Sequence, residues 1–103
     1  MKEKKCDLIL VEVSFEDVGY TVVHRLNVIN GDYLTPRIIG NGKTVVAQVL
    51  ELIKIIKEEK PDKVIFDRLG LGGVFYDTFM FMLKHDEYIG VDSFGSVYFK
   101  EVN

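Results

Sequence analysis

Residues Lys63–Gly73 read Lys-Val-Ile-Phe-Asp-Arg-Leu-Gly-Leu-Gly-Gly and carry the strongest local signal in the chain. Lys63–Asp67 is a short apolar run that ends in an acid, and the glycines after it form a turn into the helical stretch Val74–His85. In open α/β sheets, ligands bind at the carboxyl ends of the strands. The stretch therefore predicts a buried strand, a glycine turn and a helix, with Asp67 at the ligand-binding edge. Asp67 could equally be a strand-end acid that pairs with Arg68 or a lysine.

The residues before this stretch indicate three strands in succession. Asp7–Val13 is mostly apolar with β-branched residues, and Tyr20–Ile29 alternates between two faces. The Asn-Gly-Asp sequence at 30–32 is a hairpin signal. Tyr33–Ile39 follows, and Pro36 marks it as an edge strand because proline cannot donate to a ladder. The three strands are expected to form an antiparallel meander.

A helical period and a crossover complete the expected fold. Thr44 is the expected N-cap of a helix over Val45–Lys60, which Pro61 cannot continue. The strand and helix of the opening stretch lead into a fifth strand at Tyr88–Val91, which should pair in parallel with the fourth strand. Val97–Val102 is either a sixth strand or a tail. The order predicts an α/β fold with a mixed five-stranded sheet flanked by two helices.

Composition narrows the class of protein. A length of 103 residues predicts a single domain over 1–103, and an apolar content of 48% excludes disorder. The apolar runs are far shorter than the ~20 residues of a membrane span, and the single Cys6 suits a reducing cytoplasm. A formal net charge of −3 disfavours binding of nucleic acid over the whole surface. Any contact with DNA should be local, metal-assisted or supplied by another chain.

Acids at strand ends are the candidate metal ligands. Glu12 lies near the end of the first strand, and Asp67 ends the fourth. If these strands are parallel neighbours, their ends lie about 4.8 Å apart. Two carboxylates there could jointly hold Mg²⁺ or Mn²⁺, and Asp17 in the following loop could reach the same edge. Glu12 or Asp17 taken alone is more typical of a solvated strand end or turn.

Two other features of the sequence are possible binding sites. Gly42-Lys43-Thr44 resembles the end of a P-loop, but Arg37 stands where that motif needs its first glycine, so no nucleotide is expected. A turn that leads into a helix cap explains the same residues. His24 and His85 are isolated in sequence, and His24 is expected to be packed within its strand.

A resemblance to a known family rests on the later part of the chain. Pro61–Asp77 and Tyr88–Gly95 resemble the nuclease domain of phage terminase large subunits. That domain has an apolar strand ending in an acid, a glycine-rich turn, a helix that opens with a Tyr-Asp pair, and a strand ending near Phe-Gly. The resemblance runs from Leu8 to Gly95 and is specific only from Pro61 onward.

The resemblance implies an RNase H-like fold with strand order 3-2-1-4-5 and two-metal cleavage of double-stranded DNA. Asp67 matches the strand-four acid of the family, and Glu12 stands where the family has an Asp. Asp17 is similar in place to a secondary acid. The family's third essential acid lies well beyond the fifth strand, and Asp92 does not replace it by position. The ATPase motor domain of the family is also missing from these 103 residues.

Two functions follow as alternatives. The first is a terminase-like, metal-dependent endodeoxyribonuclease domain of DNA packaging, incomplete or weakly active, that contacts double-stranded DNA weakly. The second is a catalytically inactive RNase H-like binding or inhibitor protein that acts through a protein partner. Both place the chain in the cytoplasm of a bacterial host, encoded by a phage or prophage. The retained Asp67 favours the first, whereas the acidic charge and the change to Glu12 favour the second.

Overall fold

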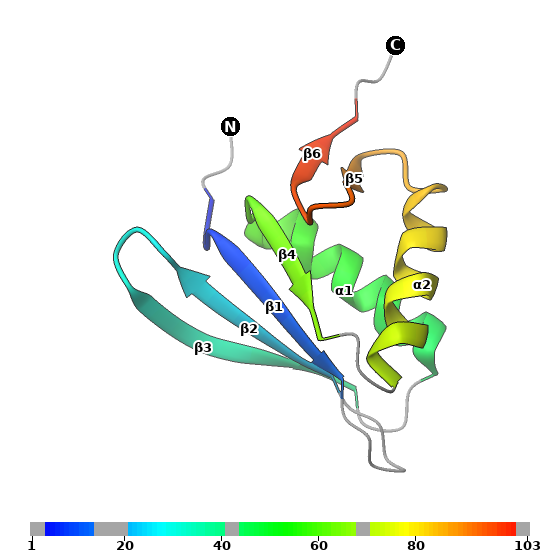
Figure 1. The fold of residues 1–103 in the computed structure, drawn as a ribbon, viewed down its shortest axis with the longest axis horizontal. Coiled ribbons are helices and arrows are strands. Elements are labelled where there is room, and N and C mark those ends of the chain that lie inside the picture. The colour runs from blue at the N-terminus through cyan, green and yellow to red at the C-terminus, as the bar shows by residue number, and fades with distance from the viewer. Residues whose placement is uncertain (1–3, 14–20, 41–43, 68–70, 101–103) are drawn as a thin grey trace.

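The computed structural model describes residues 4–13, 21–40, 44–67 and 71–100. Its main feature is a mixed four-stranded sheet in the order β3-β2-β1-β4 (Figure 1). The strands are β1 (Leu8–Val13), β2 (Thr21–Asn27), β3 (Asp32–Ile39) and β4 (Lys63–Phe66). β1 pairs antiparallel with β2 and parallel with β4. The prediction that the first strand lies centrally, between the second and a parallel fourth, is therefore confirmed.

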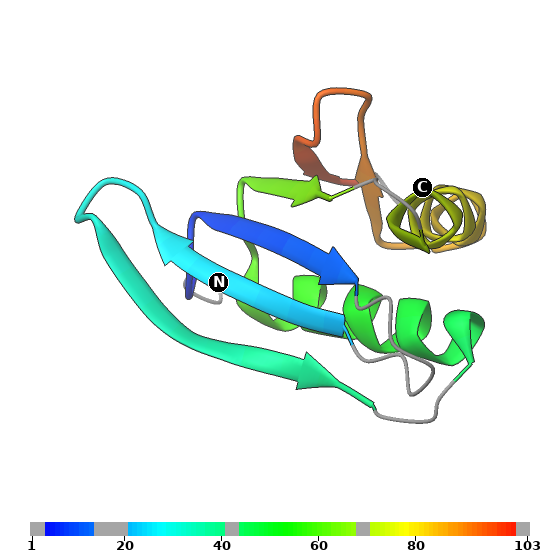
Figure 2. The ribbon, with the colours of Figure 1, turned by 60° about the horizontal axis from the view of Figure 1, so that its bottom comes forward.

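Both helices pack on the same face of this sheet, as the turned view in Figure 2 also indicates. Helix α1 (Val45–Glu59) starts at Thr44, whose side chain accepts a hydrogen bond from the amide of Ala47, so the predicted cap is confirmed. Helix α2 (Leu71–Leu83) begins three residues before the predicted start. No helix among the described residues is long and apolar enough to cross a membrane.

The predicted fifth strand does not join the sheet. β5 (Ile89–Val91) pairs antiparallel with β6 (Val97–Phe99) in a separate two-stranded sheet. Between them, the Asp92 carboxylate accepts hydrogen bonds from the amides of Phe94 and Ser96. This tight turn reverses the chain, so β5 pairs with β6 in a local hairpin and not with β4. The five-stranded order 3-2-1-4-5 is therefore wrong for the described residues, and the sheet has four strands.

The returning hairpin covers part of the outer edge of β4 instead. The amide of Val64 donates to the carbonyl of Gly95 at 2.8 Å, and Lys63 forms an isolated antiparallel bridge with Ser96. Gly95 has a φ of +84°, and a Cβ there would lie 2.5 Å from the Val64 oxygen. The close contact between these two segments therefore depends on glycine at this position.

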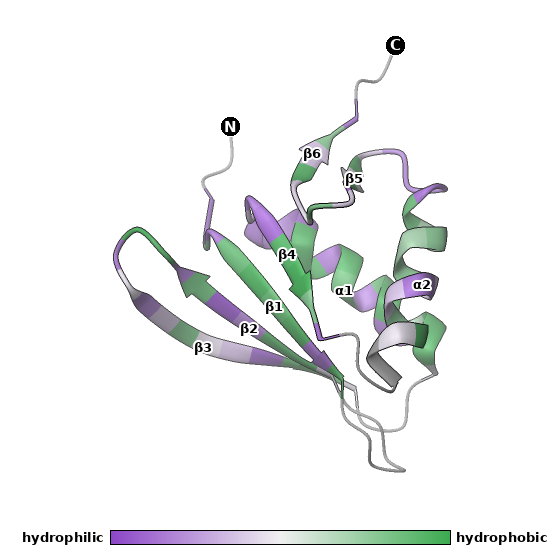
Figure 3. Cartoon of the chain, in the orientation of Figure 1, coloured by the Kyte–Doolittle hydropathy of each residue, from purple (hydrophilic) through white to green (hydrophobic). Residues whose placement is uncertain are grey.

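The core lies between the sheet and the two helices. Apolar stretches of both strands and helices appear green in Figure 3. The core includes these buried residues: Ile9, Val11, Val23, Ile39, Leu52, Ile56, Phe75 and Phe79. Polar contacts cross the same layer, because Thr21 donates to the Gln48 side chain at 2.6 Å and Arg25 pairs with the buried Glu59 at 2.6 Å. These contacts fix α1 against β2.

Strand β3 is an edge strand, as Pro36 predicts, and it carries an irregularity. Its pairing with β2 steps from Val23 opposite Arg37 to Arg25 opposite Leu34. Two residues of β3, at 35 and 36, thus lie opposite one residue of β2, which is a β-bulge. The proline occupies the bulge, where the ladder needs no donor from it.

Candidate open sheet face

The face of the sheet away from the helices carries the candidate site, and we call it the open face. Because strand residues alternate between faces, the pairing register assigns residues to it. It comprises Leu8, Leu10, Glu12, Val22, His24, Leu26, Tyr33, Ile38, Lys63 and Ile65. None of these is fully buried, and the Ile38 residue is 66% exposed. Both described helices pack against the opposite face.

Three polar side chains from three neighbouring strands contact one another along a diagonal of the open face. The Nδ1 atom of His24 is hydrogen-bonded to the Tyr33 hydroxyl, and its Nε2 atom lies 3.5 Å from a carboxylate oxygen of Glu12. These residues come from β2, β3 and β1 respectively. They occupy diagonal positions of neighbouring strands, which are within reach of long and aromatic side chains.

Glu12 and Asp67, the two predicted strand-end acids, occupy neighbouring backbone positions at one end of the open face. The Asp67 amide donates to the Val11 carbonyl at 3.0 Å, which continues the β1–β4 ladder by one residue. Since Val11 pairs with Phe66, Asp67 falls beside Glu12 on the same face of the sheet. The Glu12 side chain is 59% exposed and lies beside His24. The third predicted ligand, Asp17, lies outside the described residues.

The donor set at this end is small. Within residues 4–13, 21–40, 44–67 and 71–100, no group of three or more His, Cys, Asp or Glu side chains is placed to hold a metal ion. Two carboxylates supply only a few of the ligands of a hard cation such as Mg²⁺, which would keep most of its water ligands. They do not by themselves fit the two closely spaced cations of a two-metal site, which need more negative charge.

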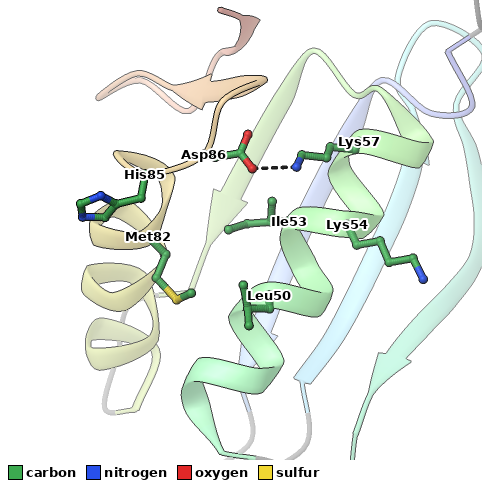
Figure 4. A pocket seen from close by; sticks show the side chains of 7 residues that line it. All are labelled: Leu50, Ile53, Lys54, Lys57, Met82, His85 and Asp86. Carbon is green, nitrogen blue, oxygen red and sulfur yellow. Dashed lines mark hydrogen bonds and ion pairs between the residues drawn. The ribbon is translucent and has the colours of Figure 1, made fainter.

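A separate groove of about 310 Å³ lies between α1 and α2. Leu50 and Met82 extend toward each other across it, as Figure 4 shows. The Lys57 ammonium closes one end by pairing with Asp86 at 2.6 Å. Leu50, Ile53 and Met82 therefore make part of the groove lining apolar, and Lys57 and Asp86 neutralise each other at its end.

Sequence reasoning missed the contacts that His24 makes on the open face. His24 was expected to be an isolated, packed histidine, but it is partly exposed and lies between Tyr33 and Glu12. The alternation of β2 did place His24 beside Val22 and Leu26 on one face. What it could not supply was the register with β1 and β3, which brings the partners opposite.

Comparisons with known proteins give no relative for this arrangement: no family model, curated protein or solved structure matches the chain.

Proposed function

We propose that this chain is an RNase H-like domain that works by binding a partner protein through the open face of its sheet. The support for the RNase H-like assignment is the meander of β1, β2 and β3, with β1 parallel to β4 after a helical connection. The proposed kinship with terminase nuclease domains rests on the resemblance of Pro61–Asp77 and Tyr88–Gly95. The chain is expected to act in the cytoplasm of a bacterial cell, encoded by a phage or prophage.

The observation that carries the proposal is the apolar character of the open face. An antiparallel sheet can face water on one side, but that side is then normally polar. Here most of the residues on the open face are aliphatic or aromatic, from Leu8 and Leu10 on β1 to Ile38 on β3. Contiguous exposed apolar patches of this kind mark interaction sites. Burying a fully exposed side chain such as Ile contributes ~1.5–3 kcal/mol, so a few of them support a specific complex.

The proposal is tested by comparing two matched exposed positions. A photoreactive phenylalanine analogue at Ile38, on the open face, should cross-link a partner inside cells that the same analogue at Val74, on α2, does not. The two residues are 66% and 57% exposed, so accessibility is similar. The purified partner should then bind the wild type and the Val74→Glu variant but not Ile38→Glu.

Equal cross-linking from both positions, or undiminished binding by a folded Ile38→Glu variant, would contradict the proposed role of the open face. Circular dichroism of both variants establishes that they remain folded. Because Ile38 is an exposed residue of an edge strand, its replacement should cost little stability.

A second candidate function is metal-dependent cleavage of DNA, as in the family that the sequence resembles. The observation that favours it is the neighbouring placement of Glu12 and Asp67 at the carboxyl ends of parallel strands. In this function the two acids would hold one Mg²⁺ or Mn²⁺ ion, and Asp17 would be a further ligand. The contact with double-stranded DNA would be weak, because a net charge of −3 gives no general attraction for phosphate.

A further inference from the structure

Helix α2 has an exposed apolar side that no element among the described residues covers. Only Asp77 is charged among the 13 residues of the helix, Leu71–Leu83. Phe79 lies in the core, whereas Phe81 and Val74 are 61% and 57% exposed. A helix that is apolar around most of its circumference is normally covered on every side. The exposed side of α2 is therefore suited to contact with another molecule.

The exposed residues of α2 and of the turn that ends it lie along one side, which we call the outer stripe. The stripe comprises Val74, Asp77, Phe81, Lys84 and His85, which are all exposed and three or four residues apart along each turn. On its buried side, α2 packs against α1, β1 and β5. Figure 1 shows α2 at the margin of the molecule, with the sheet and the hairpin of β5 and β6 on the same side of it. The outer stripe lies opposite the buried side and faces away from these elements.

Two charges of the outer stripe are complementary to each other. Asp77 lies four residues before Phe81, and Lys84 lies three residues after it. Neither charged group forms an ion pair with another residue of the part of the chain that the structure describes. If two α2 helices pack antiparallel about a two-fold axis close to Phe81, Asp77 of each copy lies beside Lys84 of the other. A parallel pair of helices would instead bring like charges together.

We propose that the outer stripe binds the outer stripe of a second copy of this chain, with the two α2 helices antiparallel. Two-fold symmetry then forms the ion pair between Asp77 and Lys84 twice. Phe81 meets its own counterpart close to the axis, and Val74 lies beside His85 of the other copy. The ring of His85 already contacts that of Phe81, with 5.3 Å between the centroids. The central aromatic residue is therefore supported within each copy before the two associate.

The charges of the stripe favour a second copy over a partner of uniform charge. A polyanion would be attracted to Lys84 but repelled by Asp77, and a basic partner would meet the reverse. The α2 helix of a second copy carries both charges at the spacing that matches them. Because α2 packs on the face of the sheet opposite the open face, the two surfaces can be occupied together. The inference is therefore independent of the proposed function.

The size of the stripe sets the strength of the dimer. Five residues of each copy form it, whereas standard interfaces use about 20–30 residues on each side. The dimer should therefore be weak, in equilibrium with the monomer and largely dissociated at the low micromolar concentrations in which unfolding is measured. Sedimentation velocity from low micromolar to millimolar protein should show the sedimentation coefficient rising with concentration.

Exchanging the two charges one at a time tests the arrangement. Asp77→Lys alone brings the new lysine beside Lys84 at both ends of the contact, and Lys84→Asp alone brings two acids together there. Each variant alone should dimerise at least about tenfold more weakly than the wild type, because like charges face each other twice. An equimolar mixture of the two variants should recover the dimer, because each exchanged charge then meets its opposite.

Two further variants complete the experiment. Asp32→Lys makes the same change of charge as Asp77→Lys at an exposed position on β3, and it should dimerise as the wild type does. Phe81→Glu places two carboxylates close to the axis and should abolish the dimer. Circular dichroism establishes that each variant remains folded, as expected for substitutions of exposed residues.

Recovery of the dimer on mixing supports the antiparallel contact. A wild type that stays monomeric at millimolar concentration, a mixture as weak as its components, or a folded Phe81→Glu variant that dimerises normally overturns it. A photoreactive phenylalanine analogue at Phe81 that captures a different protein, with a monomeric wild type, also removes the second copy as occupant. The open face is judged separately, because the analogue at Ile38 reports on its partner, whereas a second copy captured at Val74 reports on the α2 contact.

Discussion

Asp86 joins the end of α2 to two other segments. Its carboxylate accepts hydrogen bonds from the Lys57 ammonium on α1 and from the amides of Tyr88 and Ile89 ahead of and within β5. Burial acts to raise the pKa of Asp86, but the hydrogen bond from Lys57 and those from the two amides outweigh it, so the pKa lies below its usual value. The ionised form is therefore favoured by the folded state.

Asp86→Asn should lower the free energy of unfolding at neutral pH by about 2 kcal/mol, a typical contribution of hydrogen bonds to a charged group. A carboxyl whose pKa is lowered on folding stabilises the protein above its unfolded pKa, and this contribution is lost as pH falls through the folded pKa. The difference between wild type and variant should therefore shrink on acidification. Urea denaturation at neutral and acidic pH measures it, with Asp77→Asn on the exposed side of α2 as control. An equal difference at both pH values would contradict the assigned ionisation.

Cys6 is fully buried beside the core. Burial raises the pKa of its thiol to about 11, and the nearby Glu59 carboxylate acts in the same direction. Since the thiolate is the reactive form, the native protein should react very slowly with iodoacetamide near neutral pH. The same reagent should label Cys6 quickly in denaturant, and mass spectrometry follows both rates. Rapid labelling of the folded protein would show that this part of the core opens readily.

At the scale of elements, the hairpin of β5 and β6 is held to β4 through Gly95. Gly95→Ala should destabilise the protein by about 2 kcal/mol or more, because the left-handed backbone is unfavourable for alanine and the new Cβ would collide with the Val64 carbonyl. Hydrogen exchange of the Val64 amide, which bonds to Gly95, should accelerate. Thermal unfolding gives the loss of stability.

Gly31 supplies a matched control for that experiment. Its φ is +73°, close to that of Gly95, but nothing lies within 4 Å of a Cβ placed there. Gly31→Ala should cost only the backbone penalty, about 1 kcal/mol. Equal losses in the two variants would mean that the contact with Val64 contributes little.

The sequence predicted the elements whose signals are local. Thr44 caps α1 because its side chain bonds within one helical turn, and Pro36 marks β3 as an edge because the ring removes a donor. The partner of β5 could not be predicted in this way. It depends on whether Asp92 turns the chain back, and the apolar run at Ile89–Val91 suits a local hairpin and a parallel sheet equally well.

For the whole molecule, the number of carboxylates available to hold metal ions bears on the nuclease alternative. The chain alone should nick supercoiled plasmid very poorly or not at all in Mn²⁺, because Glu12 and Asp67 can offset the charge of one cation but not of two. Asp67→Ala is the control for contaminating activity. Strong nicking by the wild type that disappears in the variant would favour the nuclease function over the binding function.

The candidate site was predictable only in part at this scale. Glu12 and Asp67 share an edge because β1 and β4 are parallel neighbours, and this pairing was implied only by the resemblance to a known family. The contacts of His24 with Glu12 and Tyr33 depend on the register of three strands. Residues 14–20 connect β1 and β2, and a connection of that length does not fix a register as a two-residue turn does. The contacts of His24 therefore depend on long-range strand pairing, which a local sequence pattern does not predict.

The proline-filled bulge in β3 has a consequence for behaviour in concentrated solution. An edge strand with free amides and carbonyls is a template for strands of other molecules, and bulges and prolines are the means by which proteins block such growth. On the opposite side of the sheet, the segment around Gly95 already occupies the start of β4. Both margins are thus interrupted, so the protein should remain clear and negative for thioflavin fluorescence when concentrated. Under conditions that promote aggregation, fibrils should appear first in variants that replace Pro36 with a β-branched residue.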